Sequence, residues 1–307
     1  MARIAEWCAA AALGLLVSFP LAAAAPSASY AESVAAARAM RVAELTRVDG
    51  YLALTASGWL DPGANSVGSA ADNRFVLPAA PAHLGVLQLA ASGEVSLRLA
   101  DTSGITVDGQ PAAATVALRT QGPEGAQQPT RVGFGSSYLY VVENGDQRGL
   151  RVKDNSARLR THFPGLDYFP IDPAWRVEAD WVPFATPHTL RIAYVTGTEA
   201  DVPIIGKAVF QRDGHTYELL PIVEGDQLFF VFTDRTAGRL TYGGARFLYA
   251  AMPKNGKLLL DFNLAQNPPC AITPHVVCPL APPENRLQLA VTAGEKKFAE
   301  VAVPRDH

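Results

Sequence analysis

The chain has 307 residues, of which 49% are hydrophobic and 18% are charged. This is the balance of a globular protein, and the length allows one large or two modest domains. The formal net charge is −3 and the 26 basic residues are scattered along the sequence. No basic patch of the kind that binds nucleic acid or anionic lipid is present, so we expect no nucleic-acid partner.

The first residues are typical of a secretory signal peptide. Arg3 precedes an apolar stretch from Cys8 to Ala25, and small residues follow. The stretch is short for a bilayer span, consists mostly of alanine and contains Pro20, which favours a cleaved leader over a membrane anchor. We therefore expect removal of residues 1–24 and a periplasmic or extracellular product without a membrane anchor.

Loss of this leader leaves Cys270 and Cys278 as the remaining cysteines. Such a pair in an oxidising compartment favours a disulfide. Closing so short a loop is worth about 2.5 kcal/mol in the chain-entropy estimate. A zinc site that adds His275 is the alternative, but the spacing is unusual and no fourth ligand is evident. We accordingly expect neither a metal nor a cofactor.

One helix is predicted, within residues 25–49. Ser29 and Glu32 have the spacing of a capping box, and an alanine-rich stretch follows as far as Arg47. A partly apolar stripe along this helix predicts that it packs on the body of the protein; it comprises Val34, Arg38, Val42 and Leu45.

Residues 50–160 are predicted to form a first β-sandwich unit, because short alternating runs recur between turn residues. The pairs Asp108-Gly109 and Asn144-Gly145 indicate hairpins, since these residues tolerate positive φ. The predicted strands include Leu84–Ala90, Glu94–Ala100, Gly104–Gly109, Ser137–Gly145 and Arg148–Asp154.

Residues 161–175, THFPGLDYFPIDPAW, contain three prolines and no periodicity, which indicates a rigid connection. Alternating runs resume over residues 176–303 and predict a second β-rich unit with a turn at Asp213-Gly214. Its predicted strands are Arg176–Val182, His188–Val195, two strands within Gly206–Val223, Asp226–Asp234, Ala245–Ala251, Gly256–Phe262 and Arg286–Ala293. The fold class is therefore mainly β, with two sandwich-like units and one N-terminal helix.

Three stretches in order resemble the bacterial and archaeal domain-of-unknown-function family 1684. They are GLDYFPIDPAWRVEA, DQLFFVFTDRTAGRLTYGGARFLYA and GKLLLDFNLAQNPPCAITPHVVCPLAPPENRLQLAVTAGEK. The likeness runs from about Gly50 to Lys296 and is strongest after Gly165. Because that family is named for the absence of an assigned activity, the resemblance implies a shared domain and no particular chemistry.

A second likeness concerns the first unit. The stretch GANSVGSAADNRFVLPAAPAHLG, Gly63 to Gly85, is similar to the opening of forkhead-associated sandwiches, which bind phosphothreonine. Those domains need an arginine just after the first glycine and a serine with a nearby histidine. Here Ser69 follows Gly68, and His83 has no matching serine, so the likeness implies the fold without phosphopeptide binding.

The main candidate binding site is the segment from Asp261 to Leu287. Six prolines restrict its backbone and the expected disulfide pins its loop, so it would be ordered before a ligand arrives. Its polar side chains suit a sugar or a carboxylate, with the arginine forking onto an anion. They are Asp261, Asn263, Asn267, Glu284, Asn285 and Arg286. The alternative is a stapled loop in which asparagines cap turns and Arg286 pairs with Asp261 or Glu284.

Two further patches are candidates. In TYGGARF, two glycines allow close approach of a ligand between Tyr242 and Arg246, although hairpin turns have the same composition. In the connection, Asp167 and Tyr168 lie near Asp172, and paired carboxylates between two units can serve as acid and base. Aspartates beside prolines also form turns.

Motifs of familiar enzymes are missing from the sequence, including the nucleophile elbow, the metalloprotease helix, the phosphate-binding loop and the dinucleotide fingerprint. We therefore expect a noncatalytic exported protein that binds a small molecule or an envelope protein. One alternative is an envelope enzyme, a hydrolase with Asp167, Asp172 or Asp261 as acid or base. The other is a structural accessory protein whose polar motifs are buried networks.

Overall fold

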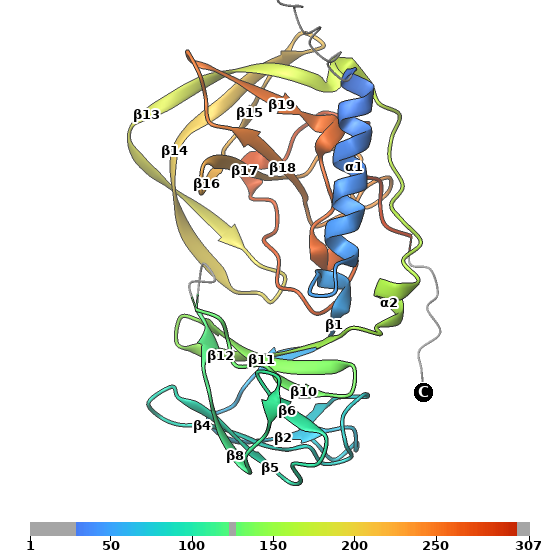
Figure 1. Cartoon of the computed structure of the whole chain (residues 1–307). Coiled ribbons are helices and arrows are strands. Elements are labelled where there is room, and N and C mark those ends of the chain that lie inside the picture. The colour runs from blue at the N-terminus through green and yellow to red at the C-terminus, as the bar shows by residue number, and fades with distance from the viewer. Residues whose placement is uncertain (1–28, 123–126, 300–307) are drawn as a thin grey trace, which may run out of the picture.

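The computed structural model describes residues 29–122 and 127–299, and shows two β-rich bodies with one long helix beside the upper one (Figure 1). The predicted signal peptide and Cys8 lie outside the described residues. Strands make up 45% and helices 14% of the structure, which confirms the mainly β prediction. No helix in residues 29–122 and 127–299 is long and apolar enough to cross a membrane.

Helix α1, Tyr30–Thr46, begins at the predicted capping box. Ser29 Oγ accepts from the backbone N–H of Glu32 at 3.3 Å, and the Glu32 carboxylate accepts from the Ser29 N–H at 2.6 Å. Two residues of the predicted stripe, Val34 and Leu45, are buried. The expectation that the helix packs on the body is confirmed.

Although α1 precedes the first unit in the sequence, it lies beside the second (Figure 1). The Tyr30 hydroxyl donates to the Asp261 carboxylate at 2.9 Å. Arg41 donates to the backbone oxygen of Asn267 at 2.9 Å and pairs with Glu295 at 3.3 Å. The helix is therefore tied to the part of the chain that carries the main sequence-predicted site.

The first unit consists of two sheets that enclose one apolar core. One sheet has the order β1-β12-β11-β10-β6-β7, with β9 beside β11, and the other has the order β3-β2-β4-β5-β8. Buried residues from both sheets, such as Leu97 and Leu139, share one cluster, as expected for a sandwich. The strands are β1 Leu54–Trp59, β2 Gly63–Gly68, β3 Phe75–Val76, β4 Gly85–Leu89, β5 Val95–Leu99, β6 Ile105–Val107, β7 Gln110–Pro111, β8 Thr115–Leu118, β9 Thr120–Gln121, β10 Val132–Phe134, β11 Ser137–Asn144 and β12 Gln147–Asp154.

Two turns in the first unit test the hairpin signals. Asp108 and Gly109 both have positive φ, 50° and 82°, between β6 and β7, as predicted. The hairpin of β11 and β12 forms too, but it turns at Gly145–Asp146, one residue later than predicted. A turn with positive φ at its first central residue favours glycine there, and Gly145 has φ 57°.

The connection contains short turns and no strand. Helix α2, Arg158–Thr161, ends at the first residue of the connection. The 3-10 turn η3, Pro173–Trp175, forms the end of the connection. A similar 3-10 turn, η1 at Tyr51–Ala53, links α1 to β1. The prolines account for the lack of a ladder, as predicted.

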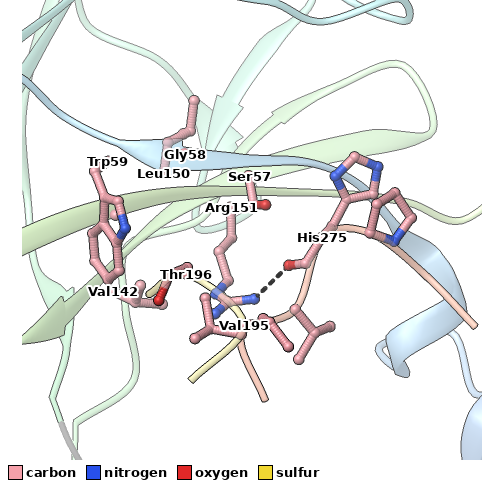
Figure 2. Close-up of a pocket in the computed structure, with 13 residues that line it drawn as sticks. Ser57, Gly58, Trp59, Val142, Leu150, Arg151, Val195, Thr196 and His275 are labelled. Atoms are coloured by element: carbon pink, nitrogen blue, oxygen red, sulfur yellow. Dashed lines mark hydrogen bonds between the residues drawn. The ribbon is translucent and has the colours of Figure 1, made fainter. Parts of the chain in front are cut away.

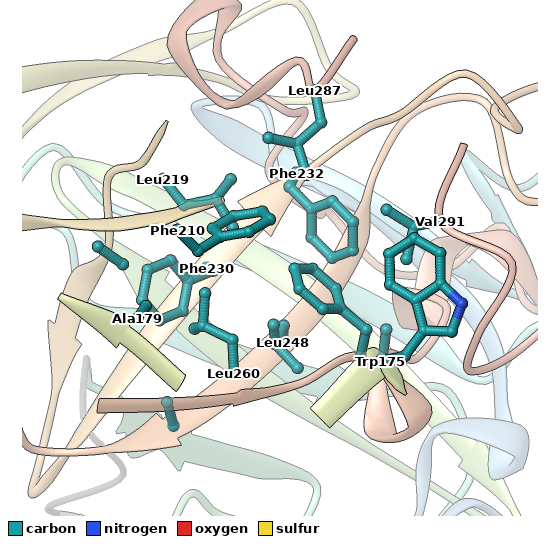
Figure 3. Packing of buried hydrophobic residues seen from close by; sticks show 14 of the residues in the cluster. Trp175, Ala179, Phe210, Leu219, Phe230, Phe232, Leu248, Leu260, Leu287 and Val291 are labelled. Carbon is teal, nitrogen blue, oxygen red and sulfur yellow. The ribbon is translucent and has the colours of Figure 1, made fainter. Parts of the chain in front are cut away.

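The second unit has a sheet in the order β15-β14-β13-β19 and a smaller sheet in the order β16-β17-β18. Its core is rich in aromatic side chains, and Phe210, Phe230 and Phe232 share one buried cluster with Trp175 (Figure 3). The strands are β13 Arg176–Ala193, β14 Glu199–Arg212, β15 His215–Leu219, β16 Ile222–Glu224, β17 Gln227–Phe232, β18 Arg246–Ala251 and β19 Lys257–Asp261.

Two predicted strands, Arg176–Val182 and His188–Val195, prove to be one long strand, β13. Its pairing with β14 shifts register between Pro183 and His188. A proline is tolerated in a strand at such an irregularity, because the missing N–H then breaks no ladder bond. The prediction of two separate strands is therefore wrong.

The predicted strand at Arg286–Ala293 does not form, although its alternating burial is as predicted. The buried residues are Leu287, Leu289, Val291 and Ala293. Arg246 donates to the backbone oxygens of Val291 at 3.0 Å and Ala293 at 2.6 Å. Asp234 accepts from the Val291 N–H at 3.3 Å. The Leu287 N–H also donates to the Thr233 oxygen at 2.8 Å, and the Leu289 oxygen accepts from the Arg235 N–H at 2.9 Å. Buried side chains and these backbone bonds together satisfy an extended segment that forms no regular strand.

Candidate functional site

Arg246, one of the sequence-predicted binding residues, lies inside the second unit and is 1% exposed. Its guanidinium pairs with Asp234 at 2.5 Å. Burial lowers the pKa of Arg246, and the Asp234 carboxylate opposes that shift. The side chain is used to hold the extended segment 286–293, and it does not reach solvent.

The three asparagines of the main candidate segment are also buried, each at 1% exposure or less. Each donates to a distant backbone oxygen: Asn263 to Asp172, Asn267 to Lys296 and Asn285 to Leu220, all at 2.8 Å. Such bonds fix the course of the chain, which matches the alternative in which the polar motifs belong to buried networks.

Two of the candidate acidic residues contact Asn263, Asp261 through its carboxylate and Asp172 through its backbone. Asp261 accepts from the Asn263 N–H at 3.1 Å, and the Asp172 N–H donates to the Asn263 side chain at 3.0 Å. Burial, together with Asp261, raises the pKa of Tyr30 to about 12. Asp167 is exposed in the connection.

Tyr168 is half-buried under Arg38, whose guanidinium lies 4.2 Å from the ring centroid. Burial raises the pKa of Tyr168 to about 12.

Glu284 and Arg286 are exposed and line a shallow hollow of about 680 Å³. Arg286 has no carboxylate within ion-pair distance among the described residues, so the alternative pairing with Asp261 or Glu284 does not occur. The hollow also contains Glu218, and its mixed charges select for no single ligand.

Cys270 and Cys278 are free thiols at the two ends of their loop, and no disulfide is found between them in the described residues. They are adjacent, since the Cys270 N–H donates to Cys278 Sγ at 3.3 Å. A hydrogen bond from the Cys278 thiol lowers the pKa of Cys270, and the same bond raises that of Cys278. The Tyr242 hydroxyl lies 4.0 Å from Cys270 Sγ, and burial raises the pKa of Tyr242 to about 12.

A cleft of about 320 Å³ lies where the two units meet, and we call it the interface cleft. The first unit supplies residues of β1, β11 and β12, and the second supplies the β13–β14 turn and the segment Pro274–Val277 (Figure 2). This segment belongs to the cysteine loop, so the loop predicted as a binding element does line a hollow. The polar residues predicted at its two ends do not line it.

Arg151 is the charged residue at the centre of this cleft. Its side chain extends from β12 between Trp59 and Thr196 on one side and His275 on the other (Figure 2). Its Nη1 donates to the backbone oxygen of His275 at 3.0 Å, and no carboxylate pairs with it among the described residues. A guanidinium has five donors, so most remain for a ligand.

The alternation of β12 explains why Arg151 faces outward. Leu150 and Val152 point into the core of the first unit, so Arg151 and Lys153 lie on the opposite face of the sheet. Gly149 lies on that face too, and a Cβ there would be 3.1 Å from the Trp59 ring. The glycine thus lets the indole lie flat on the strand as one wall of the cleft.

His275 is half-buried at the other wall. Burial lowers its pKa, and the Arg151 charge lowers it further. The imidazole is therefore neutral near pH 7, and Arg151 is the charged side chain among the residues that line the cleft. No group of His, Cys, Asp and Glu suited to a metal occurs in the part of the chain that the structure describes.

Sequence reasoning missed Arg151, Trp59 and Thr196, and considered His275 only as a metal ligand. The available signal was an arginine at an outward position of the strand RGLRVKD. That signal is weak, because outward positions of strands usually carry charged residues that face water. Only the contact between the two units makes this one part of a cleft.

Two solved structures show some likeness to the chain. An uncharacterized protein of Haloarcula marismortui, solved by NMR in solution, is 34% identical, and the match covers 46% of this chain and 80% of that chain with a TM-score of 0.38. A crystal structure of Rad53 1–466 in complex with AMP-PNP is 12% identical, covers 65% of this chain and 46% of that chain, and has a TM-score of 0.20. No curated protein matches the chain.

The family described as protein of unknown function, DUF1684, matches residues 161–296. The match takes in the connection, every strand of the second unit and the cysteine loop. It begins at the connection, so the extension of the likeness to Gly50 is not part of it. The chain belongs to the DUF1684 family.

Proposed function

We propose that the protein binds a small organic anion in the interface cleft, with Arg151 holding the anionic group. The observation that carries this proposal is a guanidinium at the centre of a cleft without a carboxylate partner among the described residues. Planar bidentate hydrogen bonds make arginine well suited to a carboxylate. The charge and its free donors thus favour an anion over a neutral ligand.

The walls of the cleft favour a ligand whose remaining part, beyond the anionic group, is apolar. Val142, Val195, Val277 and the Trp59 ring surround Arg151. The volume of about 320 Å³ lies at the lower end of the range for small-molecule sites, about 300–1,000 Å³. A short aliphatic or aromatic carboxylate meets both requirements.

We propose binding and not catalysis at this site. In the described residues, the His275 ring has no hydrogen bond to a hydroxyl, so no nucleophile and base are paired. The carboxylates considered for a hydrolase, Asp167, Asp172 and Asp261, do not line the cleft. The enzyme alternative therefore has no support from the cleft geometry.

We also propose that the protein is exported and that Cys270 and Cys278 form a disulfide there. The leader pattern supports export, and the contact of 3.3 Å between Cys270 N and Cys278 Sγ supports pairing. Intact mass of protein from the envelope fraction should show loss of residues 1–24 and two thiols that resist alkylation until reductant is added. Retention of the leader would contradict export, and free thiols in the exported product would contradict the disulfide.

The binding proposal is tested by thermal unfolding of the mature protein with hexanoate or benzoate. A ligand that binds only the folded state raises the melting temperature. We expect both acids to raise it and hexylamine to leave it unchanged.

Arg151→Gln should abolish the rise caused by the acids. Arg98→Gln is the matched control, because Arg98 is an exposed strand residue of the same unit outside the cleft. An equal rise in the Arg151→Gln and Arg98→Gln variants, or no rise in the unmodified protein, would refute the site.

A further inference from the structure

A second hollow adjoins the interface cleft on the outer face of the first unit. It has a volume of about 520 Å³ and lies against the link between α1 and β1. The two hollows share Val142, Arg151, Val276 and Val277, so they meet at Arg151. We call the second hollow the Lys153 groove.

The register of the sheet places two cations side by side in this groove. Arg151 lies opposite Tyr140 and Lys153 lies opposite Tyr138 in the pairing of β11 with β12. Residues i and i+2 of a strand project from the same face and are about 7 Å apart. Arg151 and Lys153 therefore leave the strand on one face, and their cationic groups donate to the backbone oxygens of His275 and Asp49.

Neither cation is neutralised by a carboxylate among the described residues. The Lys153 ammonium donates to the backbone oxygen of Asp49 and lies 5.9 Å from the Tyr140 ring centroid. The carboxylates that line the groove, Glu44 and Asp49, both pair with Arg47, at 3.2 Å and 3.1 Å. An ammonium has three donors, so Lys153 keeps donors for a ligand.

The surroundings make this lysine sensitive to an added negative charge. Burial lowers the pKa of Lys153, the Asp49 charge opposes this shift, and the charges of Arg131 and Arg151 lower the pKa further. A half-buried cation beside other cations gains more from an anion than a solvated one does, because the charges are less screened.

We infer that the ligand is an elongated dianion, with one anionic group on Arg151 and the other on Lys153, and its body along Tyr140 and Val276. This inference rests on the proposed function, since Arg151 is the shared anchor. Because the two side chains leave the strand about 7 Å apart and turn to different partners, His275 and Asp49, we expect a linear dicarboxylate longer than succinate to span them. The distance between the two anionic groups of the ligand, and not the size of an aromatic ring, would then decide which anion is bound.

Titration calorimetry on the mature protein tests this with malonate, succinate, adipate and hexanoate. Adipate and hexanoate have the same chain length and differ by the second carboxylate. We expect adipate to bind at least about tenfold more tightly than hexanoate, as one added charge-assisted hydrogen bond allows. Malonate should bind less tightly than adipate, because its carboxylates are too close to reach both cations.

Lys153→Met should remove the advantage of adipate and leave hexanoate binding unchanged, whereas Lys153→Arg should keep the advantage. Lys207→Met is the matched control, since Lys207 is a half-buried strand lysine of the second unit that pairs with Glu218. It should leave both affinities unchanged, and its melting temperature calibrates any loss of fold in Lys153→Met.

The outcomes separate the two proposals. Equal affinities for adipate and hexanoate in the unmodified protein, or an adipate advantage that survives Lys153→Met, would overturn the dianion and leave the Arg151 site standing. Binding of neither acid would overturn both. An advantage that Lys153→Met removes and Lys153→Arg restores would establish the Lys153 groove as part of the site.

Discussion

The two units bury asparagine side chains in different ways. In the first unit, Asn65 is fully buried but bonds only to Asp61 and Gly63, within four residues of itself. In the second, Asn285 bonds to Leu220 and Val231, which are 65 and 54 residues away. A local bond shapes a turn, whereas a distant one joins parts of the chain that no strand connects.

The same difference extends over the whole end of the second unit. From Phe262 to Lys296 the described chain contains 3-10 turns and no strand, yet much of it is buried. A buried backbone must find hydrogen-bond partners, and in the first unit the sheets supply them. Here Arg246, Asp234 and the buried asparagines supply several of them, beside backbone bonds such as that from the Leu287 N–H to the Thr233 oxygen. Polar residues in a buried segment without strands are thus part of the scaffold.

The strongest test of this contrast is Arg246→Ala. The change leaves the buried Asp234 carboxyl without its ion-pair partner, and removes the donors to the Val291 and Ala293 backbone oxygens. We expect a loss of about 3–5 kcal/mol in the free energy of unfolding, measured by urea denaturation. Arg191→Ala is the control, because Arg191 forms an exposed pair with Asp201 and should have no measurable effect. Equal stabilities of the two variants would contradict the scaffold role.

A smaller loss of unfolding free energy is expected from the buried asparagines, and it should be larger for the asparagine whose hydrogen-bond partners are more distant in the sequence. Asn285→Ala leaves the N–H and oxygen of Leu220 and the oxygen of Val231 without their partner, which should cost about 2–3 kcal/mol. Asn65→Ala should cost about 1 kcal/mol, since its partner Asp61 lies in an exposed turn that water can reach. Urea denaturation of both variants measures the difference, and a larger loss in Asn65→Ala would break the comparison.

The first unit is the part of the fold that the sequence predicts well. Its strands alternate in burial because each packs one face on a shared core, and turn residues with positive φ mark its hairpins. The turn at Gly145–Asp146 lies one residue later than predicted, because the pairing of β11 with β12 decides which two residues form the turn. Turn residues in the sequence therefore mark a hairpin without fixing its register. The segment 286–293 shows the same alternation without a ladder, since alternation reports burial and not the partner of the backbone.

The candidate site was less accessible to sequence reasoning. Local composition singled out Asn263, Asn267 and Asn285, and the structure assigns their hydrogen bonds to the scaffold. Arg151 and Trp59 look like ordinary strand residues in the sequence. They form a cleft with His275, which lies in the other unit and 124 residues after Arg151 in the chain. Only tertiary structure carries that information.

A third test uses pH, because buried Glu295 belongs to the scaffold of the second unit. Burial raises its pKa above the ordinary 4.5, and Arg41 only partly opposes the shift. The folded state therefore binds this proton more tightly than the unfolded state, and its contribution to stability is lost as pH rises from below 4.5 through the folded pKa. Glu295→Gln resembles the protonated form. As pH rises through the folded pKa, the free energy of unfolding of this variant should increase relative to that of the unmodified protein.

Glu32→Gln provides a control of opposite sign for this test. Hydrogen bonds from the Ser29 backbone and hydroxyl lower the pKa of Glu32, so its contribution is present above the ordinary pKa and is lost as pH falls. Urea denaturation from about pH 3 to about pH 7 in steps of about one unit follows both variants. Parallel pH profiles of Glu295→Gln and the unmodified protein would show that the buried carboxyl is not titrating in the folded state.

The smallest expected effect concerns the local signal that the sequence states most clearly, the cap of α1. Ser29→Ala removes the side-chain acceptor for the Glu32 N–H and should cost about 1 kcal/mol. Ser29→Asp restores an acceptor at the same place and should recover the loss in urea denaturation. Because α1 packs on the second unit through Arg41 and Asn267, its fraying should also increase amide exchange there before it does so in the first unit. If amide exchange increased first in the sheet of β1, β11 and β12, the helix would instead be coupled to the first unit.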